Sequence, residues 1–168
     1  VTVDTTAPAA PSITSVTDDV APNTGTLTSG GSTNDTNLTV RVSLSSTNAV
    51  AGDTIQLYNS SSSLGSAYTL LAADITNGYA DVATGSLTDG STYSINAKVI
   101  DKAGNASAAS GNFSVTVDTT APSAPSITSV TDNVAPTTGS LTSGASTNDT
   151  DLTVRVSLSS TNAVAGDT

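Results

Sequence analysis

The sequence contains no cysteine, histidine, tryptophan, methionine or glutamate. Without cysteine, no disulfide, thiolate metal site or cysteine nucleophile can form, and without histidine the usual general base of enzymes is missing. The many serines therefore have no histidine to activate them as nucleophiles. No run of about 18 apolar residues occurs, so the sequence predicts no direct insertion into a membrane. These absences exclude the common catalytic arrangements, and we expect no enzymatic activity.

Positive charge is scarce as well, because four basic residues stand against fourteen aspartates and the formal net charge is −10. Nucleic acids and anionic lipids attract basic surfaces, so no nucleic acid is expected as a partner of this acidic chain. Aspartate without glutamate disfavours helices and favours turns and loops, where a short carboxylate caps backbone groups or binds a hard cation. The basic residues are Arg41, Lys98, Lys102 and Arg155.

Aromatic residues are few, one phenylalanine and four tyrosines, so a hydrophobic core has to be built from valine, isoleucine, leucine and alanine. Residues 38–44 alternate strictly between apolar and polar, which predicts a half-buried strand, and residues 93–99 repeat this pattern. Residues 17–37 keep almost no apolar period and predict a long ordered loop. Further strands are expected at 12–16, with a bulge, and at 54–57, 68–71, 79–87 and 113–117.

About seven short strands separated by turn signals are typical of an all-β fold, and specifically of an immunoglobulin-like antiparallel β-sandwich. Tyr93 follows the turn at Asp89, which fits the tyrosine corner of such a sandwich. Two residues later, Ile95 occupies the position at which antibody domains carry a cysteine. We therefore expect packing alone to join the two sheets.

The segment VTVDTTAP at residues 1–8 returns unchanged at 115–122, which gives an internal period of 114 residues. Over the first 54 residues, the second copy is identical to the first at 48 positions. Self-similarity of this strength predicts tandem repeats. We expect a complete module at residues 9–118, with joints at 1–8 and 119–124, and the first half of a second module at 125–168.

Four segments together carry a resemblance to a known family: VTVDTTAP at 1–8, TDDV at 17–20, LTSGGSTND at 27–35 and DKAGN at 101–105. In this order they resemble the bacterial immunoglobulin-like repeats of giant surface adhesins, which in turn resemble the RTX proteins exported by type I secretion. The resemblance covers the whole chain. In place of the family's usual second strand, Thr-Pro-Thr-Leu with a Gly/Ala-rich turn, this chain has LTVRVSL at 38–44.

The resemblance implies a structural spacer, which holds an adhesive tip away from the cell and which bound calcium stiffens at and near the linkers. It also implies an extracellular location at the cell surface and a role in biofilm formation. Neighbouring repeats of the same chain would be the partners, and other domains would bind the adhesion ligand.

The topology of such a sandwich would gather aspartates at its two ends. Where repeats stack end to end, carboxylates from several segments would meet, and calcium takes roughly six to eight oxygen ligands. One end is expected to hold Asp18, Asp19, Asn34, Asp35, Asp89 and Asp118, and the other Asp4, Asp53, Asp74, Asp101 and Asn105.

Each of these aspartates, taken alone, is best explained as the cap of a turn, whereas the converging group favours a metal site. The adjacent pair Asp18 and Asp19 is the strongest local signal, and Asp81, inside a strand, is not expected as a ligand. The candidate calcium ligands are Asp4, Asp18, Asp19, Asp35, Asp89, Asp101, Asn105, Asp118 and Asp132.

Two other functions stay open. A groove or loop set of the sandwich could bind a glycan or a protein, although such a module is expected to expose more aromatic side chains. The chain could also be an accessory domain of a secreted enzyme with a separate catalytic domain. The near-identity of the copies favours the spacer, because specialised binding sites tend to lie in unique domains.

Overall fold

The structure is a computed structural model and describes residues 2–164 of the chain. The chain divides into two compact units, with the boundary between Thr119 and Thr120. Regular structure is almost entirely β-strand, with one short helix among the described residues. The fold is therefore all-β, as the alternating sequence patterns predict.

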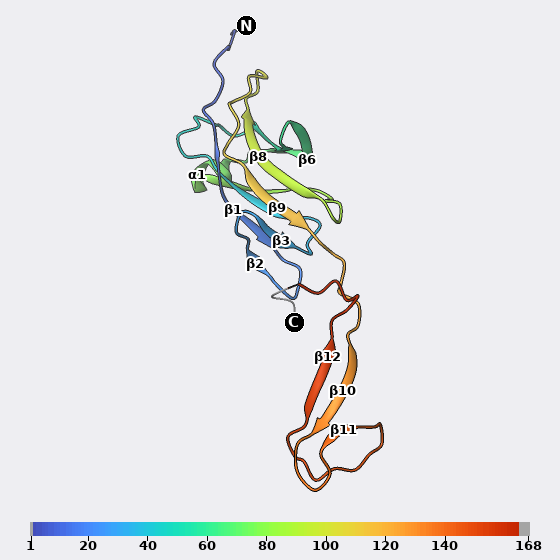
Figure 1. The fold of residues 1–168 in the computed structure, drawn as a ribbon. Helices are drawn as coiled ribbons and strands as arrows, with labels where there is room; N and C mark the ends of the chain where they lie inside the picture. Colours follow the sequence, from blue (N-terminus) through green and yellow to red (C-terminus); the bar gives the residue numbers. More distant parts are fainter. Residues whose placement is uncertain (1, 165–168) are drawn as a thin grey trace. The chain divides into compact units, whose positions relative to one another are not determined.

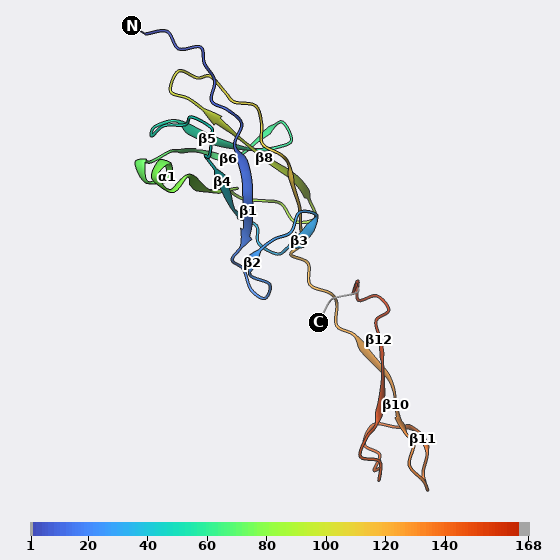
Figure 2. The ribbon, with the colours of Figure 1, turned by 90° about the vertical axis from the view of Figure 1, so that its left-hand side faces the viewer.

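In the first unit, one sheet consists of four antiparallel strands in the order β2-β1-β4-β7 (Figures 1 and 2). The register of β1 against β4 shifts between Ile13 and Ser15, which confirms the predicted bulge. The strands are β1 (Ser12–Asp18), β2 (Gly25–Thr26), β4 (Thr39–Ser43) and β7 (Tyr79–Ala83).

The other sheet of this unit has five strands in the order β3-β9-β8-β5-β6. Its pairs are antiparallel except for β3 and β9, which run parallel and align Gly31 with Val115. Parallel neighbours need a long connection between them, and here residues 34–112, most of the first unit, connect β3 to β9. The strands are β3 (Gly31–Thr33), β5 (Thr54–Asn59), β6 (Ser62–Thr69), β8 (Thr92–Ile100) and β9 (Phe113–Val117).

Both sheets contribute side chains to a single hydrophobic core. On β4, Val40 and Val42 are fully buried while Arg41 between them is not, which confirms the half-buried strand that the alternation predicts. From the other sheet, Ile95 and Val115 are equally buried. Because the chain has no disulfide, this apolar contact joins the sheets.

Three expectations from the sequence are wrong in detail. The strand expected at 79–87 is shorter, because β7 ends at Ala83. Residues 17–37 are not one loop, because β1 extends to Asp18 and both β2 and β3 lie within the segment. These short polar strands have no apolar period, so their pairing decides their conformation, β2 with the preceding β1 and β3 with the distant β9. The strand expected at 68–71 is part of the longer β6, and the helix α1 (Ala72–Asn77) follows it and ends at Gly78, whose φ of 76° is left-handed.

The second unit has three described strands, in the order β11-β10-β12. β10 and β12 pair in the same register as β1 and β4, with the same shift, here between Ile127 and Ser129. The apolar face of β12 is open, since Val154 and Val156 are each 48% exposed. The strands are β10 (Ser126–Asp132), β11 (Gly139–Leu141) and β12 (Thr153–Ser157).

Candidate functional site

Strand β8 lies between the two groups of predicted residues in the first unit. Asp89 stands in the turn before β8, and Asp101 follows its last residue. Asp18 is the last residue of β1, and the end of the unit that holds Asp18 and the loops with Asp35 and Asp89 is called the Asp18 end. The end that holds the loop with Asp101 and Asn105 is called the Asp101 end.

At the Asp18 end, two buried carboxylates meet at one threonine. Asp18 is 1% exposed and Asp35 is 3% exposed. The hydroxyl of Thr33 donates to Asp18 Oδ2 at 2.5 Å, and the backbone N–H of Asp35 donates to Thr33 Oγ1 at 3.0 Å. Thr33 therefore connects the two loops that carry the aspartates.

Backbone N–H groups satisfy the remaining oxygens of this pair. Val20 donates to Asp18 Oδ1 at 2.8 Å, and Asn37 donates to Asp35 Oδ1 at 2.7 Å. The N–H of Asp19 donates to Asp35 Oδ2 at 3.3 Å, whereas the residue Asp19 itself is exposed. Each oxygen of the buried pair thus accepts a hydrogen bond, and the pair holds the loops together.

Hydrogen bonds also connect the residues after β9 to the Asp18 end. The backbone N–H of Thr119 donates to Asp89 Oδ1 at 2.7 Å, and that of Asp118 donates to the carbonyl oxygen of Thr33 at 2.8 Å. The chain therefore leaves the last strand beside the buried pair. The predicted residues that the structure brings to this end are Asp18, Asp19, Asn34, Asp35, Asp89 and Asp118.

At the Asp101 end, three carboxylates line one open cavity of about 500 Å³. They come from three distant segments: Asp4 near the N-terminus, Asp53 before β5, and Asp101 after β8. Lys102 lines the same cavity, and its side chain lies against Gly52. The carboxylates surround a shared space without converging on one point, and an ammonium group stands beside them.

Asp101 and Asn105 form a compact turn at this end. Asp101 Oδ1 accepts the N–H of Ala103 at 2.9 Å and that of Asn105 at 2.8 Å, and Asn105 Nδ2 donates to Asp101 Oδ2 at 2.9 Å. These bonds, foremost the one from the Asn105 side chain, favour the charged form and lower the pKa of Asp101. Asn105 Nδ2 also donates to the carbonyl oxygen of Asp4 at 3.1 Å, which ties the N-terminal segment to this end.

Asp132 is the counterpart of Asp18 in the second unit, and it has equivalent partners. The hydroxyl of Thr147 donates to Asp132 Oδ2 at 2.5 Å, and the backbone N–H of Asn133 donates to Asp149 Oδ2 at 3.0 Å. Backbone donors, that of Asn133 foremost, lower the pKa of Asp149. The described strands of this unit form a single sheet, so the loop forms without a second sheet in its own unit.

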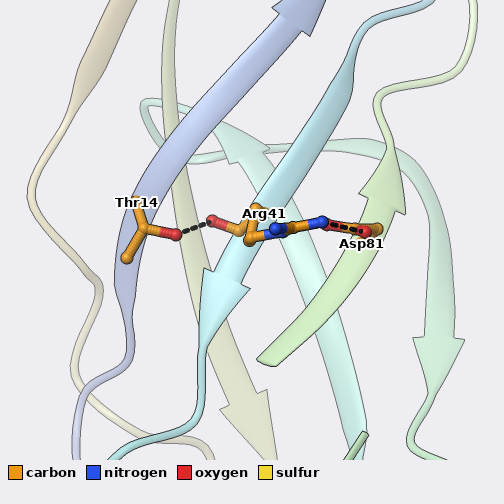
Figure 3. A network of polar contacts seen from close by, with 3 residues as sticks. All are labelled: Thr14, Arg41 and Asp81. Carbon is orange, nitrogen blue, oxygen red and sulfur yellow. Dashed lines mark hydrogen bonds and ion pairs between the residues drawn. The ribbon is translucent and has the colours of Figure 1, made fainter. Parts of the chain in front are cut away.

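Asp74 and Asp81 have partners of their own. Asp74 accepts the hydroxyl of Tyr68 at 3.0 Å and the N–H of Leu71 at 2.7 Å, at the start of α1. Asp81 accepts two hydrogen bonds of 2.8 Å from the guanidinium of Arg41 (Figure 3). The hydrogen bond from Arg41, together with its positive charge, lowers the pKa of Asp81, although partial burial acts in the opposite direction.

The sequence does not single out Thr33 or Lys102. The triplet Thr-Asn-Asp at 33–35 recurs unchanged at 147–149, and this recurrence is the signal that could have identified the threonine. The position of Lys102 depends on two loops meeting at Gly52, which no local pattern encodes.

Among residues 2–164, no three acidic side chains lie close enough together to hold a metal ion. The predicted junction sites, which combine ligands from two repeats, stay a prediction. No helix in this part of the chain has the length and apolar character needed to cross a membrane. No known protein family, curated protein or solved structure matches the chain.

Proposed function

We propose that the first unit is an immunoglobulin-like sandwich and that the chain is built from tandem repeats of it. Two sheets share one core, and the short strand β3 adds to β9 in parallel. The N–H of Thr88 donates to the hydroxyl of Tyr93 at 2.8 Å, as a tyrosine corner requires, and Ile95 is fully buried. The identical register of β1–β4 and β10–β12 supports the repeat.

The proposed function of the chain is that of a structural spacer in an extracellular surface adhesin. The path of the backbone through the first unit supports this role (Figures 1 and 2). Asn105 holds the N-terminal segment at the Asp101 end, and the chain leaves β9 beside Thr33 at the Asp18 end. The nine residues of β8 separate these ends by about 30 Å. Each repeat of this kind therefore extends the chain and does not fold it back.

The second part of the proposal is calcium bound at the ends of the repeats. Asp4 Oδ2 and Asp53 Oδ1 accept no hydrogen bond from residues 2–164, so each carboxylate can offer an oxygen to a cation. Asp101 uses both oxygens within its own turn, and the buried Asp18 and Asp35 use all four of theirs. The Asp101 end therefore fits calcium better than the buried pair does.

Lys102 makes the cavity at the Asp101 end less favourable for calcium. It lines the cavity together with Asp4, Asp53 and Asp101, and its positive charge opposes the entry of a further cation. We expect Lys102→Gln to increase the affinity for calcium, because the substitution removes a competing cation. An unchanged or lower affinity in calorimetric titration would remove this cavity from the proposal.

The direct test is the melting temperature of the chain in millimolar calcium and in EDTA. A ligand that binds only the folded state stabilises it by about 2.7 kcal/mol when its concentration is a hundred times Kd. We expect a higher melting temperature in calcium, and a smaller increase in magnesium at the same ionic strength. The same melting temperature in calcium and in EDTA would contradict the metal-binding part of the proposal.

A pair of variants with the same charge change localises the site. Asp118→Ala is expected to weaken calcium binding, because Asp118 lies where the chain leaves the first unit. Asp81→Ala is the matched control, since Arg41 already holds the carboxylate of Asp81 on the face of the sheet. Equal, small effects of both substitutions in calorimetric titration would contradict a site at the joint.

A further inference from the structure

Thr33 connects the strand by which the chain enters the first unit with the strand by which it leaves. Its hydroxyl donates to Asp18 Oδ2 at 2.5 Å, and Asp18 is the last residue of β1. Its carbonyl oxygen accepts the N–H of Asp118, directly after β9, at 2.8 Å. A path from the end of β1 to the end of β9 therefore runs through one residue and two hydrogen bonds. This path is called the Thr33 link.

A pull on the two ends of the first unit stretches this link along its length. The segment before β1 is held at the Asp101 end, because Asn105 Nδ2 donates to the carbonyl oxygen of Asp4. From there β1 runs to Asp18, and the chain leaves the unit after β9 at the Asp18 end. The pull therefore draws Asp18 towards the Asp101 end and Asp118 away from it, and Thr33 lies between the two.

The backbone between Asp18 and Thr33 is slack in the folded unit. It turns back on itself, because β2 pairs with β1 and aligns Gly25 with Asp18. Residues 19–32 would span roughly 50 Å if extended, whereas the hydrogen bond keeps Asp18 and Thr33 in contact. Tension therefore reaches Thr33 through the side-chain bond and not along the loop.

Burial and further hydrogen bonds strengthen the link. Asp18 and Thr33 are both buried, so water does not compete for the bond between them. A hydrogen bond to a carboxylate is stronger than one between neutral groups, and a low dielectric strengthens it further. The N–H of Asp35 donates to Thr33 Oγ1, and the parallel pairing of β3 and β9 aligns Thr33 with Val117. Thr33 is thus fixed to the strand by which the chain leaves.

β1 depends on the link because its own sheet holds it in two short ladders. The ladder between β1 and β4 is interrupted between Ile13 and Ser15. β2, the other neighbour of β1, has two residues. The chain has no cysteine, so no disulfide connects β1 to the rest of the unit. The link is therefore the contact that keeps the end of β1 beside the exit of the chain.

We propose that the Thr33 link bears tension along the chain and that β1 leaves its sheet only after the link opens. The inference rests on the spacer function proposed above, since a spacer between a cell and an attached adhesive tip is pulled at both ends. The link acts without calcium, because it consists of hydrogen bonds within one unit.

The test stretches single molecules of the full chain at constant force, in EDTA. Because the chain has no cysteine, Thr2→Cys and Ser123→Cys supply two unique attachment points at exposed residues on either side of the first unit. The readout is the rate of the first lengthening. Thr33→Val keeps the size of the side chain and removes its hydroxyl, and we expect it to increase this rate about tenfold. Thr33→Ser retains a hydroxyl and should restore the rate to within about twofold of the unsubstituted chain.

Thr84→Val is the matched control. Thr84 is fully buried, and its hydroxyl donates to the carbonyl oxygen of Gly85 at 3.0 Å, outside the strands by which the chain enters and leaves. We expect its rate to stay within about twofold of the unsubstituted chain. If Thr33→Val does not fold, Asp18→Asn replaces it in the test. This variant keeps an acceptor but loses the charge, so we expect an increase of about threefold.

The outcomes separate the link from the spacer. Equal rates with and without the Thr33 hydroxyl, or an equal increase in Thr84→Val, would overturn the link. A first unit that nevertheless resists the pull would leave the spacer function standing. A first unit that lengthens at the lowest applied force, with Thr33 intact, would contradict both proposals.

Discussion

The two units contain the same strand pair in different surroundings. Val40 in the first unit is completely buried, whereas its counterpart Val154 is 48% exposed, although β4 and β12 have identical sequences and identical registers against their neighbours. Pairing and register are therefore properties of the two strands alone. Burial depends on the strands β5, β7, β8 and β9, which supply the rest of the core in the first unit.

The loops after β1 and β10 lead to the same conclusion for polar contacts. Asn34 Nδ2 donates to the carbonyl oxygen of Ala21 at 2.9 Å, and Asn148 Nδ2 donates to that of Ala135 at 3.0 Å. The hydrogen bond from a threonine hydroxyl to the buried aspartate recurs with the same distance of 2.5 Å, although Thr147 is exposed and Thr33 is buried. Contacts within about 15 residues thus form in both units, although the first unit has two sheets and the described residues of the second form one.

The largest difference is expected between Leu44 and Leu158, which are equivalent residues but 7% and 61% exposed. Leu44→Ala opens a cavity in the core and should lower the unfolding free energy of the first unit by about 2–4 kcal/mol. Leu158→Ala should change the second unit by less than about 0.5 kcal/mol, because its side chain is exposed. Urea unfolding followed by amide signals of both units measures each value. Equal losses would show that Leu158 is buried in solution.

The next effect is expected from Asp18→Ala, with a smaller one from Asp132→Ala. Asp18→Ala leaves the buried hydroxyl of Thr33 and the N–H of Val20 without their acceptor, which should cost about 1–3 kcal/mol. Thr147, the donor to Asp132, is exposed, so its hydroxyl can bond to water after Asp132→Ala. Asp19→Ala is the control, since its carboxylate is exposed. Amide exchange at Val20 and Val134 reports on the two loops. A loop that opens in only one unit would show that the tertiary surroundings, not the local contacts, hold it.

A smaller difference is expected between Arg41→Ala and Arg155→Ala. Arg41 lowers the pKa of Asp81, so Arg41→Ala should raise that pKa towards the ordinary value of 3.8, whereas Arg155→Ala should leave it unchanged. The ion pair stabilises the fold above this pH, and the contribution is lost as pH falls through the folded-state pKa. Carboxyl carbon shifts of Asp81 measured against pH test this. No shift with Arg41→Ala would contradict the ion pair.

The smallest effect is expected from the titration of Asp149 in the second unit. Backbone N–H groups lower its pKa below the ordinary value of 3.8, so its stabilisation of the loop is complete above that pH and is lost as pH falls through the lower value. Amide exchange at Asn133, the main donor, should accelerate in the same range. Asp149→Asn should remove this pH dependence. Acceleration that persists in the variant would assign it to another group.

The candidate site also contains residues that the sequence locates and contacts that only the tertiary structure decides. Short carboxylates in turns, such as Asp18 and Asp101, could be located from the sequence because turn residues and strand periods are local. The contacts between Asp118 and Thr33 could not, since they depend on β3 lying beside β9. The cavity shared by Asp4, Asp53 and Asp101 likewise depends on three segments meeting in space.

Alternation of apolar and polar residues with a period of two is a property of the sequence alone. It predicts the all-β class and the strand at 38–44, and its interruption predicts the bulge in β1. The internal repeat predicts that the second unit copies the loops of the first. The parallel pairing of β3 and the burial of each apolar face have no such local code. They depend on which distant segments are present to supply hydrogen bonds and apolar contacts, and this is why identical strands are buried in one unit and exposed in the other.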